Sequence, residues 1–446
     1  MRTPICDFVE RYIREDNLRL HMPGHKGVSF LGIEDRDITE VDGADVLYSA
    51  CGIIAESEKN VSEIFGSAKT KYSTEGSSLC IRAMVYLAAL CAKKEGKKPL
   101  ILAARNAHKT FISALALVGA DVEWLYPEQK ESIISCRVSA EQIEKKFNET
   151  DCLPTAVYIT SPDYLGVISD IKGISEVCRK HGVLLMVDNA HGAYLKFLPE
   201  QKHPIDLGAD ICCDSAHKTL PVLTGGAYLH VSKNAPKLLI DMAEQAMAMF
   251  ASTSPSYLIL QSLDMANEYL AKRYSDRLAE TAERVTELKN KLKENGFSLI
   301  GDEQMKVCIK AKEYGYLGYE IAKYLGEKNI VCEFYDRDFV VMMFTPEIGE
   351  DDIRRLETAL LSLPQKEKID EMLPKAGIPQ RVMTVRDAMM SPSVELDVET
   401  AYGRVLANAT VSCPPAIPIV VCGERIDETA IRLFKYYGIE KCSVVE

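Results

Sequence analysis

Two polar side chains at the ends of apolar runs could together hold an aldehyde cofactor. Lys218 follows the apolar run at 211–213, and Asp188 closes the run at 183–187. A lysine desolvated at a strand end has a lowered pKa, so its neutral amine can form a Schiff base with an aldehyde. A carboxylate at another strand end can keep a pyridine nitrogen protonated, so that the ring accepts electrons. The pair suits pyridoxal phosphate (PLP), although two ordinary strand ends of a sheet would show the same spacing.

Two other strings suit a cofactor that carries a phosphate. Gly76, Ser77 and Ser78 stand just before a predicted helix, where a flexible glycine, two hydroxyls and free helix amides can receive a phosphate. His108 lies between a predicted strand and a helix and could lie flat on an aromatic ring. Taken alone, the glycine-serine string is more often a plain helix cap, and a histidine at a helix start is more often simply exposed to water.

A third string, His21-Met-Pro-Gly-His-Lys-Gly27, contains two histidines. The Pro-Gly pair between them prevents a helical arrangement in which both histidines face one metal ion. We therefore expect no metal site there, and a turn that places polar groups near a site or a subunit contact.

The elements that must position these side chains alternate between strand and helix. Strands are expected at 100–104, 122–126, 156–160, 183–187, near 211 and at 227–231, and helices at 77–94, 109–118, 140–147 and 171–180. This alternation predicts an α/β fold whose mostly parallel sheet is covered on both faces. Ligands of such sheets bind beyond the carboxyl ends of the strands, which is where Lys218 and Asp188 are expected.

The remaining chain predicts further parts. Ser254-Pro255 resembles a helix cap that opens a long helix to about Asn295. After it, strands are expected at 307–311, 330–334 and 339–344, and helices at 317–326 and 350–363. The predicted division is an irregular arm at 1–56, a large domain at 57–295, a small α+β domain at 296–365 and a C-terminal appendage at 366–446.

Composition narrows the class of protein. The 446-residue chain has a net charge of −12 and no basic patch, so neither nucleic acid nor an anionic membrane surface is an expected partner. The fourteen cysteines form no CxxC pair, which favours reduced, buried thiols in a cytoplasmic protein. No apolar run approaches the ~20 residues of a membrane span.

Taken together, the motifs resemble the Orn/Lys/Arg decarboxylase family, a group of fold type I PLP enzymes, over nearly the whole chain. The strings that carry the resemblance are His21–Gly27, Asp37–Glu40, Asp188–Gly192, Ser215–Leu220, Ser252–Tyr257, Gly403–Val405, Pro414-Pro415 and Gly423-Glu424. The resemblance implies a mostly parallel seven-stranded sheet between helices, with a smaller α+β domain after it. It also implies the compact form of the family, without an N-terminal wing domain.

The resemblance implies a role for each matching residue. Lys218 would bind the PLP aldehyde, Asp188 would pair with the pyridine nitrogen, and His217 would lie near the phosphate or the imine. Either Lys218 or His217 would protonate the α-carbon. The ring would lie between Ala190 and His108, with His191 close by. The implied phosphate ligands are Gly76, Ser77, Ser78, Ser215 and, from a neighbouring subunit, Thr253. The last contact implies a homodimer with shared active sites.

The implied reaction is decarboxylation of lysine, arginine or ornithine to an amine that serves polyamine formation. A buried acid should meet the cationic side chain of the substrate, and Glu333, Asp336 and Asp163 are the candidates. The chain also departs from the usual family pattern: Glu75 stands where asparagine is usual, Asn189 where glutamate is usual, Ala216 where threonine is usual and Gly225 where glutamine is usual. These changes bear on substrate preference.

Two other functions remain open from the sequence. The chain could be another fold type I enzyme, such as an aminotransferase or a lyase, which keto-acid formation in place of CO₂ release would reveal. It could also be a PLP-binding protein without activity, since Glu75 and Asn189 alter the usual motifs. A Rossmann dehydrogenase is disfavoured, because no GxGxxG motif follows the first predicted strand.

Overall fold

The computed structural model describes residues 1–127, 132–371, 373–374, 377–408, 412–413 and 417–446. The predicted residues Pro414 and Pro415 lie outside this part. The chain divides into two compact units, one formed by residues 1–97 and 171–277 and the other by residues 98–170 and 278–446. Each unit thus combines segments that are distant in sequence, and the predicted division into four consecutive domains stays a prediction.

The first unit contains four strands of the large seven-stranded sheet, in the order β1-β7-β6-β5. They are β1 (Lys69–Ser73), β5 (Leu184–Asp188), β6 (Ile211–Asp214) and β7 (Ala227–Val231). Strands β5 and β6 are parallel, and β7 is antiparallel to both β6 and β1. Every residue of β5, β6 and β7 is buried, which explains their apolar sequences. The sequence did not predict β1, because it contains two lysines; Lys71 is buried against Glu58 at 2.5 Å.

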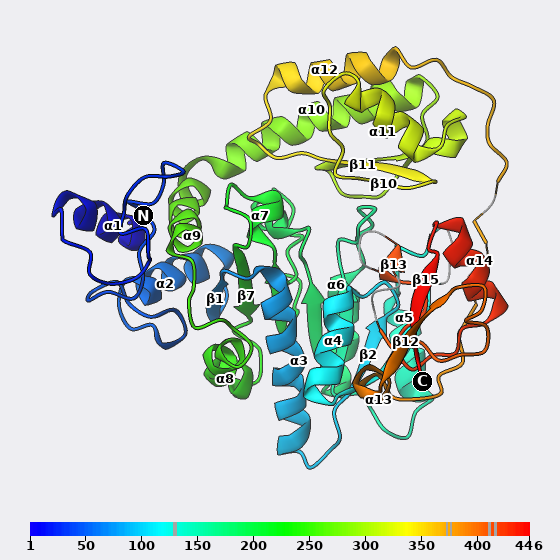
Figure 1. Ribbon diagram of the computed structural model, residues 1–446, viewed down its shortest axis with the longest axis horizontal. Coiled ribbons are helices and arrows are strands. Elements are labelled where there is room, and N and C mark those ends of the chain that lie inside the picture. Colours follow the sequence, from blue (N-terminus) through cyan, green and yellow to red (C-terminus); the bar gives the residue numbers. More distant parts are fainter. Residues whose placement is uncertain (128–131, 372, 375–376, 409–411, 414–416) are drawn as a thin grey trace. The chain divides into compact units, whose positions relative to one another are not determined.

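Helices pack around these strands (Figure 1). They are α1 (Pro4–Arg14), η1 (Leu47–Ser49), α2 (Ile53–Phe65), α3 (Gly76–Lys94), α6 (Ile171–His181), η2 (Ala193–Phe197), α7 (Ala216–Thr219), α8 (Lys237–Ala248), α9 (Tyr257–Tyr269) and η3 (Leu270–Tyr274). Among the described helices, α3 alone has the length and apolarity of a possible membrane span. It packs against α8 and β7, and half of its apolar stretch is buried inside the fold, as in the core helix of a globular protein.

The second unit contains the other three strands of the large sheet, which are parallel and lie in the order β4-β2-β3. They are β2 (Leu100–Ala104), β3 (Asp121–Leu125) and β4 (Ala156–Thr160), with helices α4 (Lys109–Val118) and α5 (Ala140–Asn148). Strands β2 and β4 and helix α4 have the predicted bounds. The mixed α/β class with a large, mostly parallel sheet is therefore confirmed.

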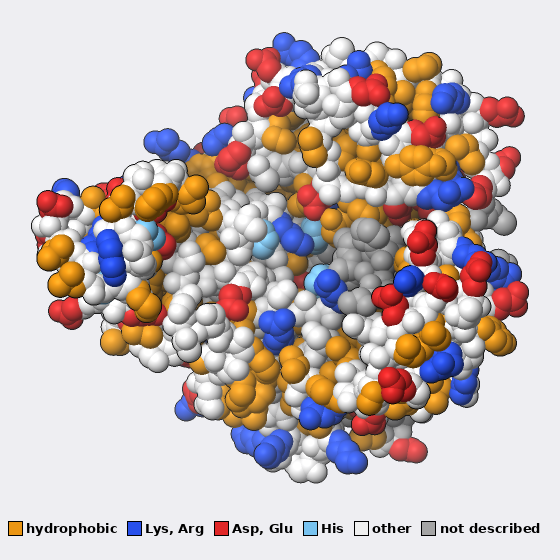
Figure 2. Space-filling model, in the orientation of Figure 1, with side chains coloured by type: hydrophobic (Ala, Val, Ile, Leu, Met, Phe, Trp, Pro, Cys, Tyr) orange, Lys and Arg blue, Asp and Glu red, His pale blue; other side chains and the backbone are white. Residues whose placement is uncertain are grey.

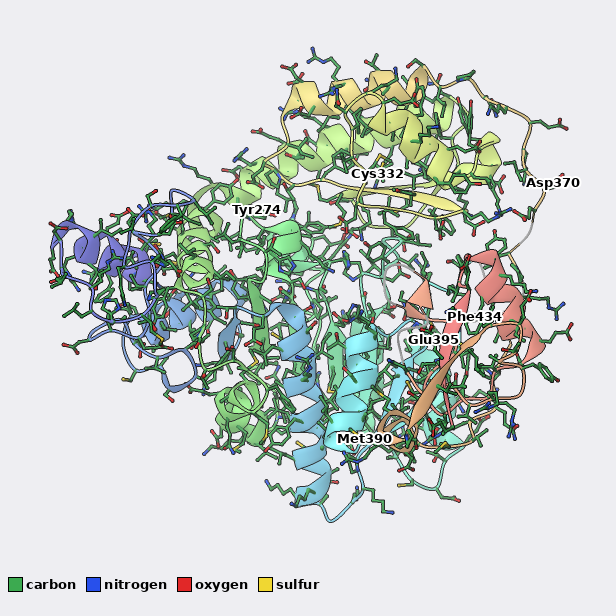
Figure 3. The ribbon with its side chains drawn as sticks, viewed as in Figure 1. Tyr274, Cys332, Asp370, Met390, Glu395 and Phe434 are labelled. Carbon is green, nitrogen blue, oxygen red and sulfur yellow. The ribbon has the colours of Figure 1, made fainter. Side chains whose placement is uncertain are left out.

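A four-stranded antiparallel sheet in the order β10-β11-β9-β8 forms the small domain of the same unit. Its elements are α10 (Ser275–Glu294), β8 (Leu299–Ile300), β9 (Lys306–Lys310), η4 (Ala311–Tyr314), α11 (Gly318–Gly326), β10 (Phe334–Tyr335), β11 (Phe339–Met343) and α12 (Glu350–Leu361). The C-terminal elements are α13 (Val385–Met390), β12 (Ser393–Asp397), β13 (Ser412–Cys413), β14 (Ile417–Pro418), α14 (Glu428–Tyr436) and β15 (Lys441–Val445). Phe434 of α14 belongs to an apolar core that α14 shares with β15 (Figure 3).

Three predicted elements differ from the structure. The arm predicted as irregular begins with helix α1, which has Pro4 at its first position, where a missing N–H costs nothing. The long helix begins at Tyr257, because the side chain of Ser256, and not of Ser254, accepts the capping bond from the backbone N–H of Ile259. Strand β10 covers only two residues of the run expected at 330–334.

Candidate active site

Lys218 lies just beyond the carboxyl end of β6, within the four-residue helix α7. Its Nζ is 3.1 Å from Nε2 of His191, which follows the end of β5. The hydroxyl of Tyr274 donates a hydrogen bond to the carbonyl oxygen of Thr219 at 3.0 Å and so anchors the end of this helix. The structure therefore brings the predicted lysine and histidine together from two separate turns.

Asp188 is the last residue of β5 and lies opposite Cys213 of β6 in the parallel register. It is only 2% exposed. Its Oδ1 accepts a hydrogen bond from the backbone N–H of Ala190 at 3.2 Å, and the Cys213 thiol lies 3.6 Å from the same oxygen. Strands β5 and β6 are neighbours in the sheet. The two predicted strand ends, which carry Asp188 and Lys218, therefore lie at adjacent turns.

The predicted phosphate ligands Ser77 and Ser215 also meet. Ser215 Oγ donates a hydrogen bond to Ser77 Oγ at 2.8 Å, joining the start of α3 to the end of β6. Gly76 has a φ of +70°, which favours glycine, and its N–H bonds to the carbonyl oxygen of Gly225 at 2.7 Å. A Cβ at Gly225 would lie 2.8 Å from the carbonyl oxygen of Thr74, so the departure to glycine there has a steric reason.

His217 is held as a neutral imidazole at the same place. Its Nδ1 donates to the carbonyl oxygen of Gly226 at 2.9 Å, which leaves Nε2 as the acceptor nitrogen. Burial lowers the pKa of His217, and the neighbouring charge of Lys218 lowers it further, against the opposing effect of the Gly226 bond. A neutral ring with an unprotonated Nε2 can accept a proton, which fits its predicted place near the imine.

The other predicted residues lie around this group or in the second unit. Ala190 is buried in the turn between Asp188 and His191, and Ser78 lies in the first turn of α3. Thr253 is exposed, one residue after Ser252, whose N–H bonds to Glu75 Oε1 at 2.7 Å. His108 caps α4 in the second unit, where its Nδ1 accepts from the N–H of Thr110. The roles of these residues toward PLP stay predictions.

The three acids predicted to meet the substrate lie in the second unit and have unlike surroundings. Asp163 is buried and accepts bonds from the N–H groups of Leu165 and Val167 and from Ser135, and burial raises its pKa to about 6. Asp336 closes the β10–β11 turn by accepting from the N–H groups of Asp338 and Phe339, both at 2.7 Å. The carboxylates of Asp163 and Asp336 thus serve their own loops.

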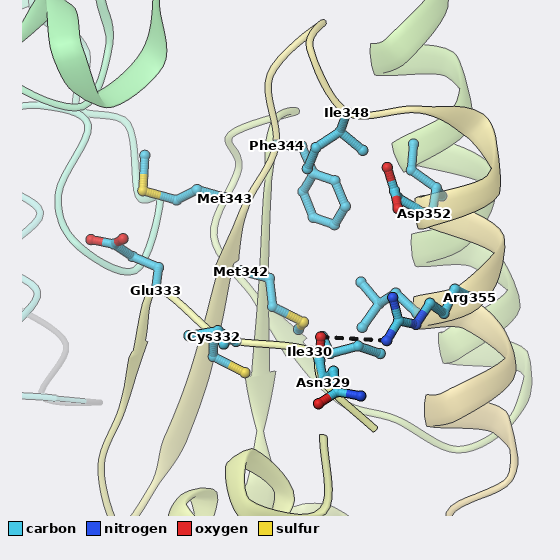
Figure 4. A pocket seen from close by; sticks show the side chains of 13 residues that line it. Asn329, Ile330, Cys332, Glu333, Met342, Met343, Phe344, Ile348, Asp352 and Arg355 are labelled. Carbon is cyan, nitrogen blue, oxygen red and sulfur yellow. Dashed lines mark hydrogen bonds between the residues drawn. The ribbon is translucent and has the colours of Figure 1, made fainter. Parts of the chain in front are cut away.

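Glu333 is different, because it is exposed and accepts one bond, from the Tyr164 hydroxyl at 2.9 Å. It stands at the edge of a cavity of about 430 Å³ between the segment before β10, strand β11 and helix α12. Figure 4 shows Met342 and Phe344 facing α12, whereas the side chain of Glu333 points away from that helix. Of the three acids, Glu333 has the carboxylate most available to another molecule.

Sequence reasoning missed a polar cluster directly behind the site. The carboxylate of Asp214 is bound by Asn189, His203 and His230. The ligand atoms of His203, Asp214 and His230 lie close enough together to suggest a metal site. Asn189 was noted only as a departure from the family pattern. A signal was present, since Asn189 follows Asp188 and Asp214 precedes Ser215, but nothing in the sequence pairs them.

Comparisons with known proteins show the family to which the chain belongs. A family model described as "Orn/Lys/Arg decarboxylase, major domain" matches residues 3–311, and its C-terminal domain model matches residues 366–441. The chain is 29% identical to an arginine decarboxylase of Bacillus subtilis over 96% of this chain and 92% of that protein. It is 28% identical to an arginine decarboxylase of Halalkalibacterium halodurans over 96% and 92%.

Solved structures show the same fold. The lysine decarboxylase LdcF of Francisella novicida superposes with a TM-score of 0.80 at 16% identity, covering 100% of this chain and 81% of that one. The constitutive lysine decarboxylase of E. coli gives a TM-score of 0.77 at 19% identity, covering 100% and 82%. At these identities the likeness concerns the fold.

Proposed function

This chain belongs to the Orn/Lys/Arg decarboxylase family and is a PLP-dependent decarboxylase, and from that premise we propose that its substrate is a basic amino acid, with L-arginine as the first candidate. Two relatives that cover nearly the whole chain are named arginine decarboxylases. The product would be the decarboxylated amine, a precursor for polyamine formation. The observation that carries the proposal is the contact of Lys218 with His191 beside the buried Asp188.

The residues of the first unit fit the cofactor. Lys218 offers a partly buried amine, Asp188 a buried carboxylate, and Ser77 and Ser215 a pair of hydroxyls at the N-terminus of α3. When bound, PLP supplies an electron sink for the pair left by the departing carboxyl group. A phosphate at this helix N-terminus would be favoured by the helix dipole.

Four side chains of the first unit would then have separate roles in the reaction. Lys218 would hold the aldehyde carbon of the cofactor. His191 orients Nζ of Lys218 and can exchange a proton with it across 3.1 Å. Asp188 would keep the ring nitrogen protonated. His217 is neutral at pH 7 with an unprotonated Nε2, so it would have to accept a proton before it could give one to the α-carbon.

Glu333 is the candidate for the cationic end of the substrate. A carboxylate binds a guanidinium through two parallel hydrogen bonds, which is stronger than a contact with a neutral group. Its bond from Tyr164 uses one oxygen, Oε1. The carboxylates of Asp163 and Asp336 are bound by their own loops, which makes them weaker candidates.

The test is a substrate panel with purified protein and added PLP. We expect CO₂ and the matching amine in equal amounts from L-arginine, with lower rates from L-lysine and L-ornithine. Lys218→Ala, which removes the proposed attachment point, is the inactive control. Keto acid in place of CO₂ would favour an aminotransferase, and a visible PLP band without any product would favour a non-catalytic PLP-binding protein.

We further propose that the enzyme is a cytoplasmic homodimer in which the segment 18–33 lies at the subunit contact. Figure 2 shows hydrophobic side chains gathered over the region that contains α1. Seven large apolar side chains of this segment are exposed, with Leu18 at 83% and Leu31 at 84%, a density that marks interaction surfaces. The exposed apolar side chains are Leu18, Leu20, Met22, Val28, Phe30, Leu31 and Ile33.

Sedimentation equilibrium tests the dimer. We expect twice the mass of one chain for the wild type and a shift toward monomer for Leu20→Asp combined with Leu31→Asp. Val331→Asp is the matched control, since Val331 is a single apolar side chain that is 93% exposed outside this segment. A wild-type monomer at micromolar concentration would contradict the proposal.

A further inference from the structure

The carboxylate of Asp214 accepts three hydrogen bonds in a fully buried position of the first unit. Its Oδ1 accepts from Nδ2 of Asn189 at 2.6 Å, and its Oδ2 lies 3.0 Å from Nε2 of His203 and 3.2 Å from Nε2 of His230. The four side chains are all 0% exposed. A buried charge is tolerated when donors surround it in this way.

The hydrogen bond on the far side of His203 shows which of its ring nitrogens carries the proton. Nδ1 of His203 faces the backbone N–H of Ile205 at 3.4 Å and therefore accepts, which places the ring proton on Nε2, toward Asp214. Nδ1 of His230 meets the hydroxyl of Thr70 at 2.8 Å. A metal ion on Nε2 of His203 would require a proton on Nδ1, against the N–H of Ile205, so the cluster is a set of hydrogen bonds and not a metal site.

The cluster leaves Asp214 ionised. Burial alone would raise the pKa of Asp214, but the two imidazoles and their hydrogen bonds outweigh burial and hold that pKa below its usual value. Burial lowers the pKa of His230, so this ring stays neutral. The ionised carboxylate of Asp214 is therefore surrounded by the N–H groups of Asn189, His203 and His230.

Asp214 and its partner Asn189 stand at the two turns that carry the site. Asn189 directly follows Asp188, and its backbone N–H bonds to the carbonyl oxygen of Cys213 at 3.0 Å. Asp214 directly precedes Ser215, which begins the turn that leads to Lys218. The bond between Asn189 and Asp214 thus ties the end of β5 to the end of β6. It lies one residue from Asp188 on the first strand and one residue from Ser215 on the second.

We propose that Asp214 is a positioning residue of the PLP site, where its ionised carboxylate, through Asn189 and the two histidines, sets the separation of Asp188 and Lys218. The inference rests on the proposed use of these two residues to hold PLP. It predicts that the polarity of the Asn189–Asp214 pair matters, and not only its volume.

The decisive variants are Asp214→Asn and the exchanged pair Asn189→Asp with Asp214→Asn. In Asp214→Asn an N–H₂ group must face either Asn189 or the histidines, all of which donate. In the exchanged pair, the new asparagine can donate to the new aspartate and accept from the histidines through its carbonyl oxygen. We expect the PLP dissociation constant to rise about 10- to 100-fold in the single variant and to return to within about threefold in the exchanged pair.

A second readout separates positioning from stability. We expect the pH midpoint of the visible PLP band to move by about one unit in Asp214→Asn, because Asp188 no longer sits correctly against the ring nitrogen. Asp264→Asn is the matched control: Asp264 is also fully buried in the first unit and accepts bonds from Ile5, Cys6 and Ser57, remote in sequence from the turns that carry the site. It should lower the melting temperature without moving the band.

Unchanged PLP affinity and band midpoint in Asp214→Asn, with a fall in melting temperature like that of Asp264→Asn, would overturn the inference. If Asp214→Asn does not fold, Asn189→Ala, which removes one donor and leaves the two histidines, decides by the same two readouts. A wild type that shows the PLP band but releases no CO₂ would contradict the proposed function alone, since neither readout depends on turnover.

Discussion

Two carboxylates, Asp214 of the first unit and the partly buried Asp336 of the second, show how differently the two regions use charge. Asp214 is bound by side chains from the turn after β5, from β7 and from the segment before β6, and its pKa lies below the usual value. Asp336 of the second unit is bound by the backbone of its own turn, and burial raises its pKa to about 6. Its Oδ2 has no hydrogen-bond partner among the described residues.

The difference between these two carboxylates indicates which region of the molecule contains the candidate active site. In the first unit, polar groups from distant segments converge on two adjacent strand ends and hold one another in place. In the second unit, Asp163 and Asp336 satisfy the N–H groups of residues two to four positions away. Burial of an acid is therefore not by itself an indicator of a binding site: Asp214 is bonded across the turns at the ends of β5 and β6, whereas Asp163 and Asp336 accept bonds from their own loops.

The largest expected effect comes from Lys218→Ala. If the first unit holds the chemistry, this change should remove the visible band of bound PLP and reduce CO₂ release by at least about 1,000-fold, because the covalent attachment point is lost. Absorbance spectra and radiometric CO₂ assays measure both. Lys237→Ala, at an exposed lysine of α8, is the control and should behave as wild type. A retained PLP band in Lys218→Ala would contradict the assignment of the chemistry to the first unit.

Asp188→Asn should have the next largest effect. An amide at this position cannot hold a proton on the ring nitrogen, so turnover should fall about 100-fold or more while PLP remains bound through Lys218. Steady-state kinetics and PLP content by absorbance measure the two quantities. Turnover within a few-fold of wild type would show that Asp188 does not act in the site.

Glu333→Gln tests whether the second unit contributes to substrate choice. Loss of the charge should raise KM for L-arginine about tenfold and leave kcat within about threefold, because a charge-assisted pair with the guanidinium is replaced by a neutral contact. Asp336→Asn is the comparison, with KM expected to be unchanged. Equal KM values in wild type and Glu333→Gln would exclude Glu333 from substrate binding.

The smallest expected effect is on stability, in Asp336→Asn. The folded pKa of Asp336, about 6, lies above its ordinary value of 3.8, so the wild type loses stability as pH rises from about 4 through 6. The variant lacks this loss and should be more stable at pH 8 by of order 1 kcal/mol, with a smaller difference at pH 4. Urea unfolding at both pH values measures the difference; destabilisation at pH 8 would contradict it.

The sequence predicted most of the large sheet, because buried parallel strands and the helices between them leave clear apolar patterns. Strands β2, β4 and β7 and helix α4 were predicted at the bounds that the structure shows. Strand β1 was missed, because its lysine is neutralised by Glu58 from α2, a pairing that no local pattern reveals. Helix α1 was missed because the glycines and prolines that follow it dominated the interpretation of the arm.

For the site, the sequence by itself determined the reactive types: a lysine and an aspartate after two apolar runs, serines at a helix start and a histidine beside the lysine. These follow from local spacing. Only the tertiary structure decided that Lys218 meets His191, that Ser77 meets Ser215 and that Asp214 holds Asn189. The reason is physical: strand order and register set which turns are neighbours, and they arise from the packing of the whole sheet.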